Sequence, residues 1–311
     1  MSEFEKIEHA VDDAIRWLEH EAKTVTPGGH GIGWRRDRPD HRDHPYVPAP
    51  ETSPPPVGGL LPDQLPPIWN QSTIGSCTAH GSLRAFVAAL MKAGITLPHT
   101  PKPIRGDGNP APFSRLEQYY NERLLENTVS TDSGAQVRDA FVALSRYGVG
   151  PESLWPYNVR EFAVRPPQSV ESAGASSKVL EYKSVKPTGR LGGPETVALS
   201  EGKVVVFGFQ VPAYFEQPDA GIDWDPTSGV PLPVPPDGYD NWLGGHCVAA
   251  SHYNFSETPV DGPYWEQLAG DFYVIENSWD VDWGIGGRFF MDSEWFRSKY
   301  ASSFWVIGSV E

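Results

Sequence analysis

The sequence predicts an α+β fold with a helical half, a β-rich half that resembles a small barrel, and a cleft where the two halves meet. Apolar residues recur at helical spacing in the first half of the chain, whereas short runs rich in Val, Ile, Phe and Tyr fill the second half. Helices first and strands later is the order typical of an α+β architecture. A cleft between two such halves is a common place for a binding or catalytic site.

Composition supports a folded chain and excludes some partners. Of the 311 residues, 39% are hydrophobic and 12% aromatic, which is enough apolar surface for a sizeable core. The formal net charge of −15 argues against a nucleic-acid partner, because such affinity comes mainly from Lys and Arg on phosphates. With only two cysteines, Cys77 and Cys247, the chain has no disulfide framework of the kind found in small secreted domains.

The N-terminal sequence does not resemble a secretory signal. Its first 22 residues are acidic and lack the basic start, apolar run and small-residue cleavage site of a signal peptide. No stretch approaches the roughly 18 uninterrupted apolar residues that a membrane-spanning helix needs. We therefore expect a soluble, cytoplasmic protein without a membrane partner.

Residues 1–65 are expected to form an N-terminal helix and an extended arm. Apolar side chains at helical spacing predict an amphipathic helix over 5–22, which needs a surface on which to lie. From residue 27 onward Pro, Gly, His and charged residues dominate, which indicates an extended segment that docks on the body. His30, His41 and His44 suggest a metal site, but their spacing matches no ligand pattern, and solvated charge pairs explain them better.

The remaining chain, 66–311, is expected to form one domain with a helical half (about 66–160) and a β-rich half (about 161–311). Helical periodicity with a glycine or a loop at the end predicts helices at 77–93, 114–126 and 135–147. β-branched and aromatic runs predict strands at 179–185, 203–211, 246–254, 271–279 and 303–310.

Cys77 is the candidate nucleophile. It lies in the first turn of a predicted helix, where unpaired N–H groups and the helix dipole stabilise a thiolate. Gln71, six residues upstream, is placed to donate its amide N–H to a developing oxyanion. Alone, a cysteine at a helix start is more often an inert buried residue.

His246 and Asn277 lie on neighbouring predicted strands, so the fold brings them together. An amide oxygen that accepts the imidazole N–H fixes the tautomer and orientation of a general base, and Trp279 is placed to shield that hydrogen bond from water. The alternatives are a satisfied core histidine and a turn residue that closes a strand.

Four ordered motifs resemble the papain family of cysteine peptidases. QSTIGSCTA is similar to the nucleophile segment, GGHCVAASHYN to the histidine strand and NSWDVDWGIGG to the asparagine segment, while YGVGPESLWPY resembles the end of the helical half. The match covers about residues 66–311. The resemblance implies a papain-like fold with Cys77, His246, Asn277 and Gln71 as the catalytic residues, and it implies no metal or organic cofactor.

This chain departs from the family pattern at several places. Thr78 follows the nucleophile where papain has Trp, Asp280 stands where Gly usually follows the Asn-Ser-Trp, and the paired cysteines are missing. These departures resemble a bacterial or viral intracellular branch. Cys77 and His246 are 169 residues apart, against about 130–150 in the family, and insertions in surface loops at about 159–178, 213–243 and 255–270 would absorb the excess.

The resemblance also assigns substrate-binding roles. Gly134 and Ala135 match the backbone strip that pairs with an extended substrate, and Phe207 is expected to wall the pocket for the second residue before the scissile bond. Cys247 borders the same pocket, although a plain buried thiol is an alternative reading. Trp279 is the fifth residue to which the resemblance assigns a substrate-binding role.

The expected function is hydrolysis of a peptide or protein substrate, by endopeptidase or exopeptidase action, through a thioester acyl-enzyme. A catalytically silent papain-fold component of a larger assembly and an acyl transferase with the same Cys-His-Asn site are the alternatives. The arm is expected to pack in or near the cleft, as a prosegment or a permanent strap.

Overall fold

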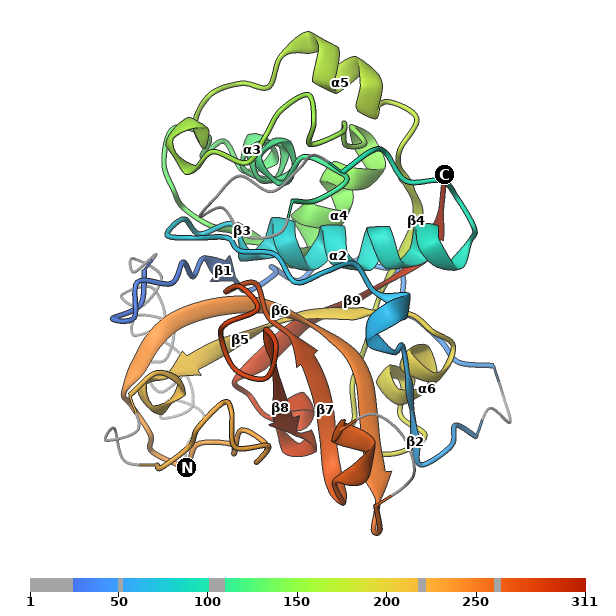
Figure 1. Ribbon diagram of the computed structural model, residues 1–311, viewed down its shortest axis with the longest axis vertical. Coiled ribbons are helices and arrows are strands. Elements are labelled where there is room, and N and C mark those ends of the chain that lie inside the picture. Colours follow the sequence, from blue (N-terminus) through green and yellow to red (C-terminus); the bar gives the residue numbers. More distant parts are fainter. Residues whose placement is uncertain (1–24, 50–52, 101–109, 218–221, 260–263) are drawn as a thin grey trace.

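The computed structural model describes residues 25–49, 53–100, 110–217, 222–259 and 264–311. Most helices gather on one side of the molecule and a twisted sheet on the other, with the long helix α2 (Cys77–Lys92) between them, while the short helix α6 (Pro194–Ser200) lies beside the sheet (Figure 1). The arrangement is the α+β fold that the sequence predicts. The amphipathic helix expected at 5–22 lies outside the described residues.

The helical half begins with α2 (Cys77–Lys92), followed by α3 (Arg115–Leu125), α4 (Val137–Arg146) and α5 (Gln168–Gly174). The first three agree within two residues at each end with the predicted helices. In α2 almost every side chain is buried, because helices cover one face of it and the sheet covers the other. Gly94, at a φ of 68°, ends the helix in the left-handed region that favours glycine.

Seven of the described strands form one sheet, in the order β4-β9-β5-β6-β7-β8 with β2 paired to β6. Its strands are β2 (Val57–Gly59), β4 (Val179–Ser184), β5 (Val205–Pro212), β6 (Trp242–Ser256), β7 (Gly270–Glu276), β8 (Arg288–Asp292) and β9 (Ala301–Val310). The paired strands are antiparallel. The barrel-like half expected from the sequence is therefore a coiled open sheet, because β4 and β8 remain its two ends.

Short elements complete the described chain: β1 (Trp34–Arg35), β3 (Ala135–Gln136) and α6 (Pro194–Ser200), with 3-10 turns at Pro62–Gln64, Val159–Glu161, Ala213–Phe215, Tyr264–Gln267 and Ser293–Arg297. Within the part of the chain that the structure describes, no helix has the length and apolar character needed to cross a membrane.

One of the expected surface insertions is a part of the core. Of the segment 213–243, Phe215, Trp224 and Leu232 are almost fully buried in the aromatic core of the β-rich half. Phe215 stacks on Trp224 with ring centroids 5.2 Å apart. The expectation of a solvated loop was wrong here, because the added length supplies its own apolar side chains.

The arm docks along the body as an extended segment. Trp34–Arg35 (β1) pairs in parallel with Ala135–Gln136 (β3). Asp37 accepts a hydrogen bond from Trp305 Nε1 at 2.6 Å, and Asp43 forms an ion pair with Arg138. The arm therefore reaches both the helical half and the sheet, and Trp34 is 2% exposed.

Candidate active site

Cys77 begins helix α2, at the boundary between the helical half and the sheet. Its side chain is fully buried. The backbone N–H groups of Cys247, Gly33 and Thr78 point toward the thiol, so strand β6, the arm and α2 itself all contact it. The sequence places the thiol at the helix start, and the fold closes it off from solvent.

His246 and Asn277 form the hydrogen bond that the sequence predicts. His246 lies on β6, Asn277 follows β7, and His246 Nε2 is 2.7 Å from Asn277 Oδ1. Asn277 Oδ1 also accepts from the backbone N–H of Ser278, and an amide oxygen only accepts, so the proton of the imidazole is on Nε2. His246 Nδ1 then carries the lone pair, and no hydrogen-bond partner for it appears among the described residues. The imidazole is thus oriented as a base.

Trp279 covers this pair as expected. Its ring stacks on His246 with centroids 4.7 Å apart and planes 27° apart, and it is 2% exposed. The next residue, Asp280, has a φ of 72°, in the left-handed region. That conformation favours glycine but is also tolerated by aspartate. Asp280 can therefore occupy the position at which the family usually has Gly.

Gln71 is held rigidly beside the nucleophile segment. Its Oε1 accepts from Ser278 Oγ at 2.5 Å and its Nε2 donates to the Ile74 carbonyl at 2.9 Å. The Gln71 backbone N–H donates to the Ser278 carbonyl, and the side chain is fully buried. Because Ser278 bonds both the backbone and the side-chain amide of Gln71, the segment after β7 positions Gln71 as well as the His246 imidazole.

The ionisation of the pair differs from the sequence expectation. Burial raises the pKa of Cys77 to about 12, and the surrounding backbone N–H groups only partly offset it. Burial likewise lowers the pKa of His246 to about 4, against the hydrogen bond to Asn277 that raises it. Desolvation penalises both charged forms, so in this arrangement the thiol and the imidazole are neutral at pH 7. The helix dipole does not by itself produce a thiolate here.

The arm lies directly over these residues. Gly31 donates its N–H to the Ser72 carbonyl, and its own carbonyl accepts from Trp279 Nε1 at 3.2 Å. A Cβ at Gly31 would stand 2.9 Å from Gln71 Nε2, the expected oxyanion donor. The arm backbone therefore occupies the space in which a substrate carbonyl would meet Gln71.

Residues 33–35 continue along the helical half, beside β3. The N–H of Ala135 donates to the Gly33 carbonyl at 2.9 Å. Gly134 has a φ of 65°, and a Cβ there would overlap that same carbonyl. The backbone strip expected to pair with substrate is thus paired with the arm.

The predicted pocket residues divide between two faces of the sheet. Cys247 is buried in the same apolar cluster as Cys77 and Trp34. Phe207 points the other way, into the core of the β-rich half, where it stacks on Phe304 at 4.8 Å. The residue that meets the arm is the next one, Gly208, at which a Cβ would overlap the Trp34 indole. Side chains alternate along a strand, so a shift of one residue moves the pocket wall from Phe207 to Gly208.

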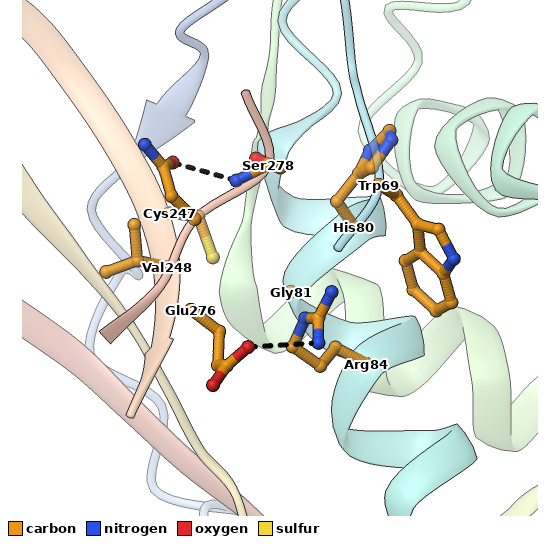
Figure 2. A pocket seen from close by; sticks show the side chains of 9 residues that line it. Trp69, His80, Gly81, Arg84, Cys247, Val248, Glu276 and Ser278 are labelled. Carbon is orange, nitrogen blue, oxygen red and sulfur yellow. Dashed lines mark hydrogen bonds and ion pairs between the residues drawn. The ribbon is translucent and has the colours of Figure 1, made fainter. Parts of the chain in front are cut away.

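Cys247 packs between β6 and α2 (Figure 2), and a Cβ at Gly81 would stand 3.1 Å from its thiol. A cavity of about 10 Å³ lies at this contact and is far too small for a peptide. Beside it, Glu276 pairs with Arg84 at 3.2 Å and with Arg288 at 2.8 Å. This buried network supports the end of β7, from which Asn277 follows.

Sequence reasoning missed one residue at the site, Glu216. It lies in the segment 213–243, which offers no motif, yet its carboxylate binds the arm at three points. His30, which we expected to be solvated, is one of them. In the described ranges, no three His, Cys, Asp or Glu side chains come together as a metal site.

No family model matches the chain. A curated relative, an uncharacterized peptidase C1-like protein of Acanthamoeba polyphaga mimivirus, is 31% identical over 256 residues, which is 80% of this chain and 72% of the relative.

Solved structures share the fold. Xylellain, a cysteine protease from Xylella fastidiosa, matches with a TM-score of 0.72 and 27% identity over 91% of this chain and 97% of its own. A procathepsin B from Trypanosoma congolense matches with a TM-score of 0.61 and 12% identity, over 90% of this chain and 86% of its own. A digestive procathepsin L of Tenebrio molitor matches with a TM-score of 0.61 and 14% identity, over 99% of this chain and 93% of its own.

Proposed function

The chain belongs to the papain-like, peptidase C1-like family of cysteine proteases, and we propose that it hydrolyses peptide bonds through a thioester on Cys77. One observation carries the proposal. The 2.7 Å hydrogen bond from His246 Nε2 to Asn277 leaves the Nδ1 lone pair for proton transfer, and the next residue, Cys247, donates its backbone N–H to the Cys77 thiol. A hydrolase of this family requires that orientation of its base.

The steps follow from the roles of these groups. Cys77 Sγ attacks the substrate carbonyl and His246 Nδ1 takes the thiol proton, while Gln71 Nε2 and the Cys77 N–H donate to the oxyanion. When the C–N bond breaks, His246 gives its proton to the leaving amine. Water then attacks the thioester with His246 as base, which releases the acid and restores the thiol. Asn277 keeps the imidazole in its tautomer throughout.

We further propose that the arm holds this enzyme latent. Its backbone at Gly31–Gly33 lies over Gln71 and Cys77, and burial keeps the Cys77 thiol and the His246 imidazole neutral while the arm is docked. The digestive procathepsin L, a proform, has the same fold over 99% of this chain. Deletion of residues 1–60 would also remove β2 from the sheet, so single substitutions in the arm are the cleaner test.

The decisive experiment is a panel of fluorogenic peptides, with free and with blocked termini, assayed with the full chain and with Cys77→Ala. We expect slow turnover in the latent full chain, faster turnover when a single substitution releases the arm, and none in Cys77→Ala, whose melting temperature should stay within a few degrees of the wild type. Loss of activity on blocked peptides alone would assign an exopeptidase. Turnover that survives Cys77→Ala, or no turnover even after the arm is released, would refute the proposal.

A further inference from the structure

Residues 25–31 of the arm form a tight turn that closes on Glu216. Thr26 and His30 hydrogen bond through their backbones at 2.8 Å, and Gly29 donates to the Thr26 carbonyl at 2.9 Å. Three donors of this turn reach one carboxylate: Thr26 Oγ1 at 2.7 Å, Gly28 N at 3.0 Å and His30 Nδ1 at 2.6 Å. The Glu216 side chain is only 6% exposed, so these contacts replace its hydration.

The ring of His30 lies flat on Trp279. The ring centroids are 4.4 Å apart and the planes differ by 10°. Trp279 also stacks on His246. His30 therefore occupies a site with an aromatic face and a carboxylate edge, and that site adjoins the catalytic base.

The charge of Glu216 decides what this site accepts. Burial alone would raise the pKa of Glu216, but the hydrogen bonds from His30, Thr26 and Gly28 outweigh it and hold the pKa below its ordinary value. The carboxylate is ionised at neutral pH and can only accept hydrogen bonds, so His30 Nδ1 is the donor. A planar ring with an in-plane N–H can stack on the Trp279 indole and donate a hydrogen bond to the Glu216 carboxylate at the same time.

We propose that Glu216 and Trp279 form a side-chain subsite for a planar group with N–H donors, the imidazole of histidine or the guanidinium of arginine, in a peptide substrate. His30 fills this subsite while the arm covers Cys77. The inference rests on the proposed peptidase function, for which it names a substrate class.

The indole of Trp279 and the carboxylate of Glu216 together favour arginine and histidine side chains over others. Guanidinium stacks on an indole face and pairs with a carboxylate through a planar fork. An acidic or aliphatic side chain would leave Glu216 buried without donors, and a site built for hydrogen bonds rejects ligands that lack them. The net charge of −15 also attracts cationic peptides to the molecule.

The arm can leave this subsite without undocking altogether. Beyond Gly33 it is fixed by the β1–β3 pairing, by the ion pair of Arg35 with Glu126 and by the bond from Trp305 to Asp37. Residues 25–33 can therefore lift as a local opening about that fixed end. A substrate enters by taking the place of His30.

The first test measures closure in the full chain. Cys77 is alkylated with iodoacetamide in the wild type, His30→Ala, Glu216→Gln and the double variant, with intact mass and peptide mapping as readouts. His41→Ala is the matched control, since His41 lies in the same arm with its side chain 96% exposed. Each single variant should accelerate alkylation about tenfold or more, the size of one lost charge-assisted hydrogen bond.

The double variant should react more slowly than the product of the two single effects, because both changes remove the His30–Glu216 hydrogen bond, whereas the stack on Trp279 and the bonds to Thr26 and Gly28 are lost separately. His30→Asn, which keeps a donor near the Nδ1 position, should restore part of the closure. Cys247 should stay unlabelled in every case, which shows that the body remains folded. Rates equal to that of His41→Ala, or strictly multiplicative effects in the double variant, would overturn the assignment of His30 to this subsite.

The second test measures recognition in the His30→Ala chain, where Glu216 and Trp279 are intact. Peptides that differ only by Arg, His, Ala or Glu, scanned through successive positions, compete with alkylation of Cys77. At one position, Arg and His peptides should protect at about tenfold lower concentration than Ala, with Glu weakest, and the preference should vanish in His30→Ala/Glu216→Gln.

The outcomes separate the two proposals. Equal protection by all four peptides at every position refutes the subsite, even if peptides are cleaved. Preferential protection by Arg and His without any cleavage supports the subsite and refutes the peptidase function.

Discussion

Trp34→Ala should release the arm from the cleft. The Trp34 indole is 2% exposed, lies against Gly208 and packs in one apolar cluster with Cys77 and Cys247. Removal of a buried Trp side chain costs about 3–5 kcal/mol. Trp34 Nε1 is buried without a hydrogen-bond partner in the described structure, so the lower end of that range applies.

The expected effect follows from the open population. Opening at Trp34 undocks more of the arm than the lift of residues 25–33 alone. A loss of about 3 kcal/mol raises the ratio of this undocked form to the docked form by about 150-fold, since about 1.4 kcal/mol is a factor of ten. When reclosing is faster than the chemistry, the rate of Cys77 alkylation and the turnover of small peptides rise by that same factor, until the open form predominates.

The assay is alkylation of Cys77 in the full chain, with Val47→Ala as the control because Val47 lies in the same arm and is 75% exposed. Cys247, in the same cluster, reports whether the whole domain has opened. A Trp34→Ala rate equal to that of Val47→Ala would refute the arm as a cover. Labelling of Cys247 in parallel with Cys77 would show that the indole stabilises the domain as a whole.

Three further predictions concern the supports of the site. Gln71→Ala should lower kcat by about 100- to 1000-fold if its amide stabilises the oxyanion, and an unchanged kcat in an arm-released background would exclude that role. Glu276→Gln should lower the free energy of unfolding by about 3–5 kcal/mol in denaturant titrations, because it leaves Arg84 and Arg288 without their buried carboxylate, and a loss under 1 kcal/mol would contradict this. Burial raises the pKa of Asp37 to about 6, so the folded state binds the proton more tightly than the unfolded state. The contribution of Asp37 to stability should therefore be complete below about pH 4 and should be lost as the pH rises through 6. Asp37→Asn should flatten that part of the plot of melting temperature against pH. An equally steep plot in the variant would contradict the role of Asp37.

The parts of the fold that the sequence predicts are those with strong local periodicity. Helix α2 was placed within one residue because its apolar side chains repeat over four turns, and β5 and β9 were found because β-branched residues fill them. β8 was missed, since the glycines that precede it obscure a five-residue run. β1 and β3 are two residues each, and they form only because the arm pairs with the segment that precedes α4. Such a long-range pairing leaves no local pattern in the sequence.

At the site, sequence motifs predict the candidate side chains but not their burial or the residues that contact them. The predictions of Gln71, Cys77, His246 and Asn277 rest on local patterns, whereas Glu216 has no pattern around it and is recognised only from the arm residues that bind its carboxylate. Phe207 and Gly208 differ by one position on a strand whose two faces are both buried, so alternation of apolar and polar residues offers no guide to the pocket face. Tertiary contacts decide these cases.

The shifted pKa values of Cys77 and His246 link the arm to the proton chemistry of the site. The arm acts on the thiol in two opposite directions: Trp34 adds to the apolar burial that raises the pKa of Cys77 to about 12, whereas the backbone N–H of Gly33 lowers that pKa as a hydrogen-bond donor. Each pKa unit that the arm adds is worth about 1.4 kcal/mol of preference for the neutral thiol while the arm is closed. By linkage, the thiolate favours the open arm by the same amount. Where burial by the arm outweighs the hydrogen bond from Gly33, formation of the thiolate and departure of the arm promote each other; where that hydrogen bond prevails, the thiolate holds the arm closed. The pH dependence of Cys77 alkylation in Glu216→Gln, compared with the wild type, distinguishes the two: a lower apparent thiol pKa in the variant shows that burial prevails.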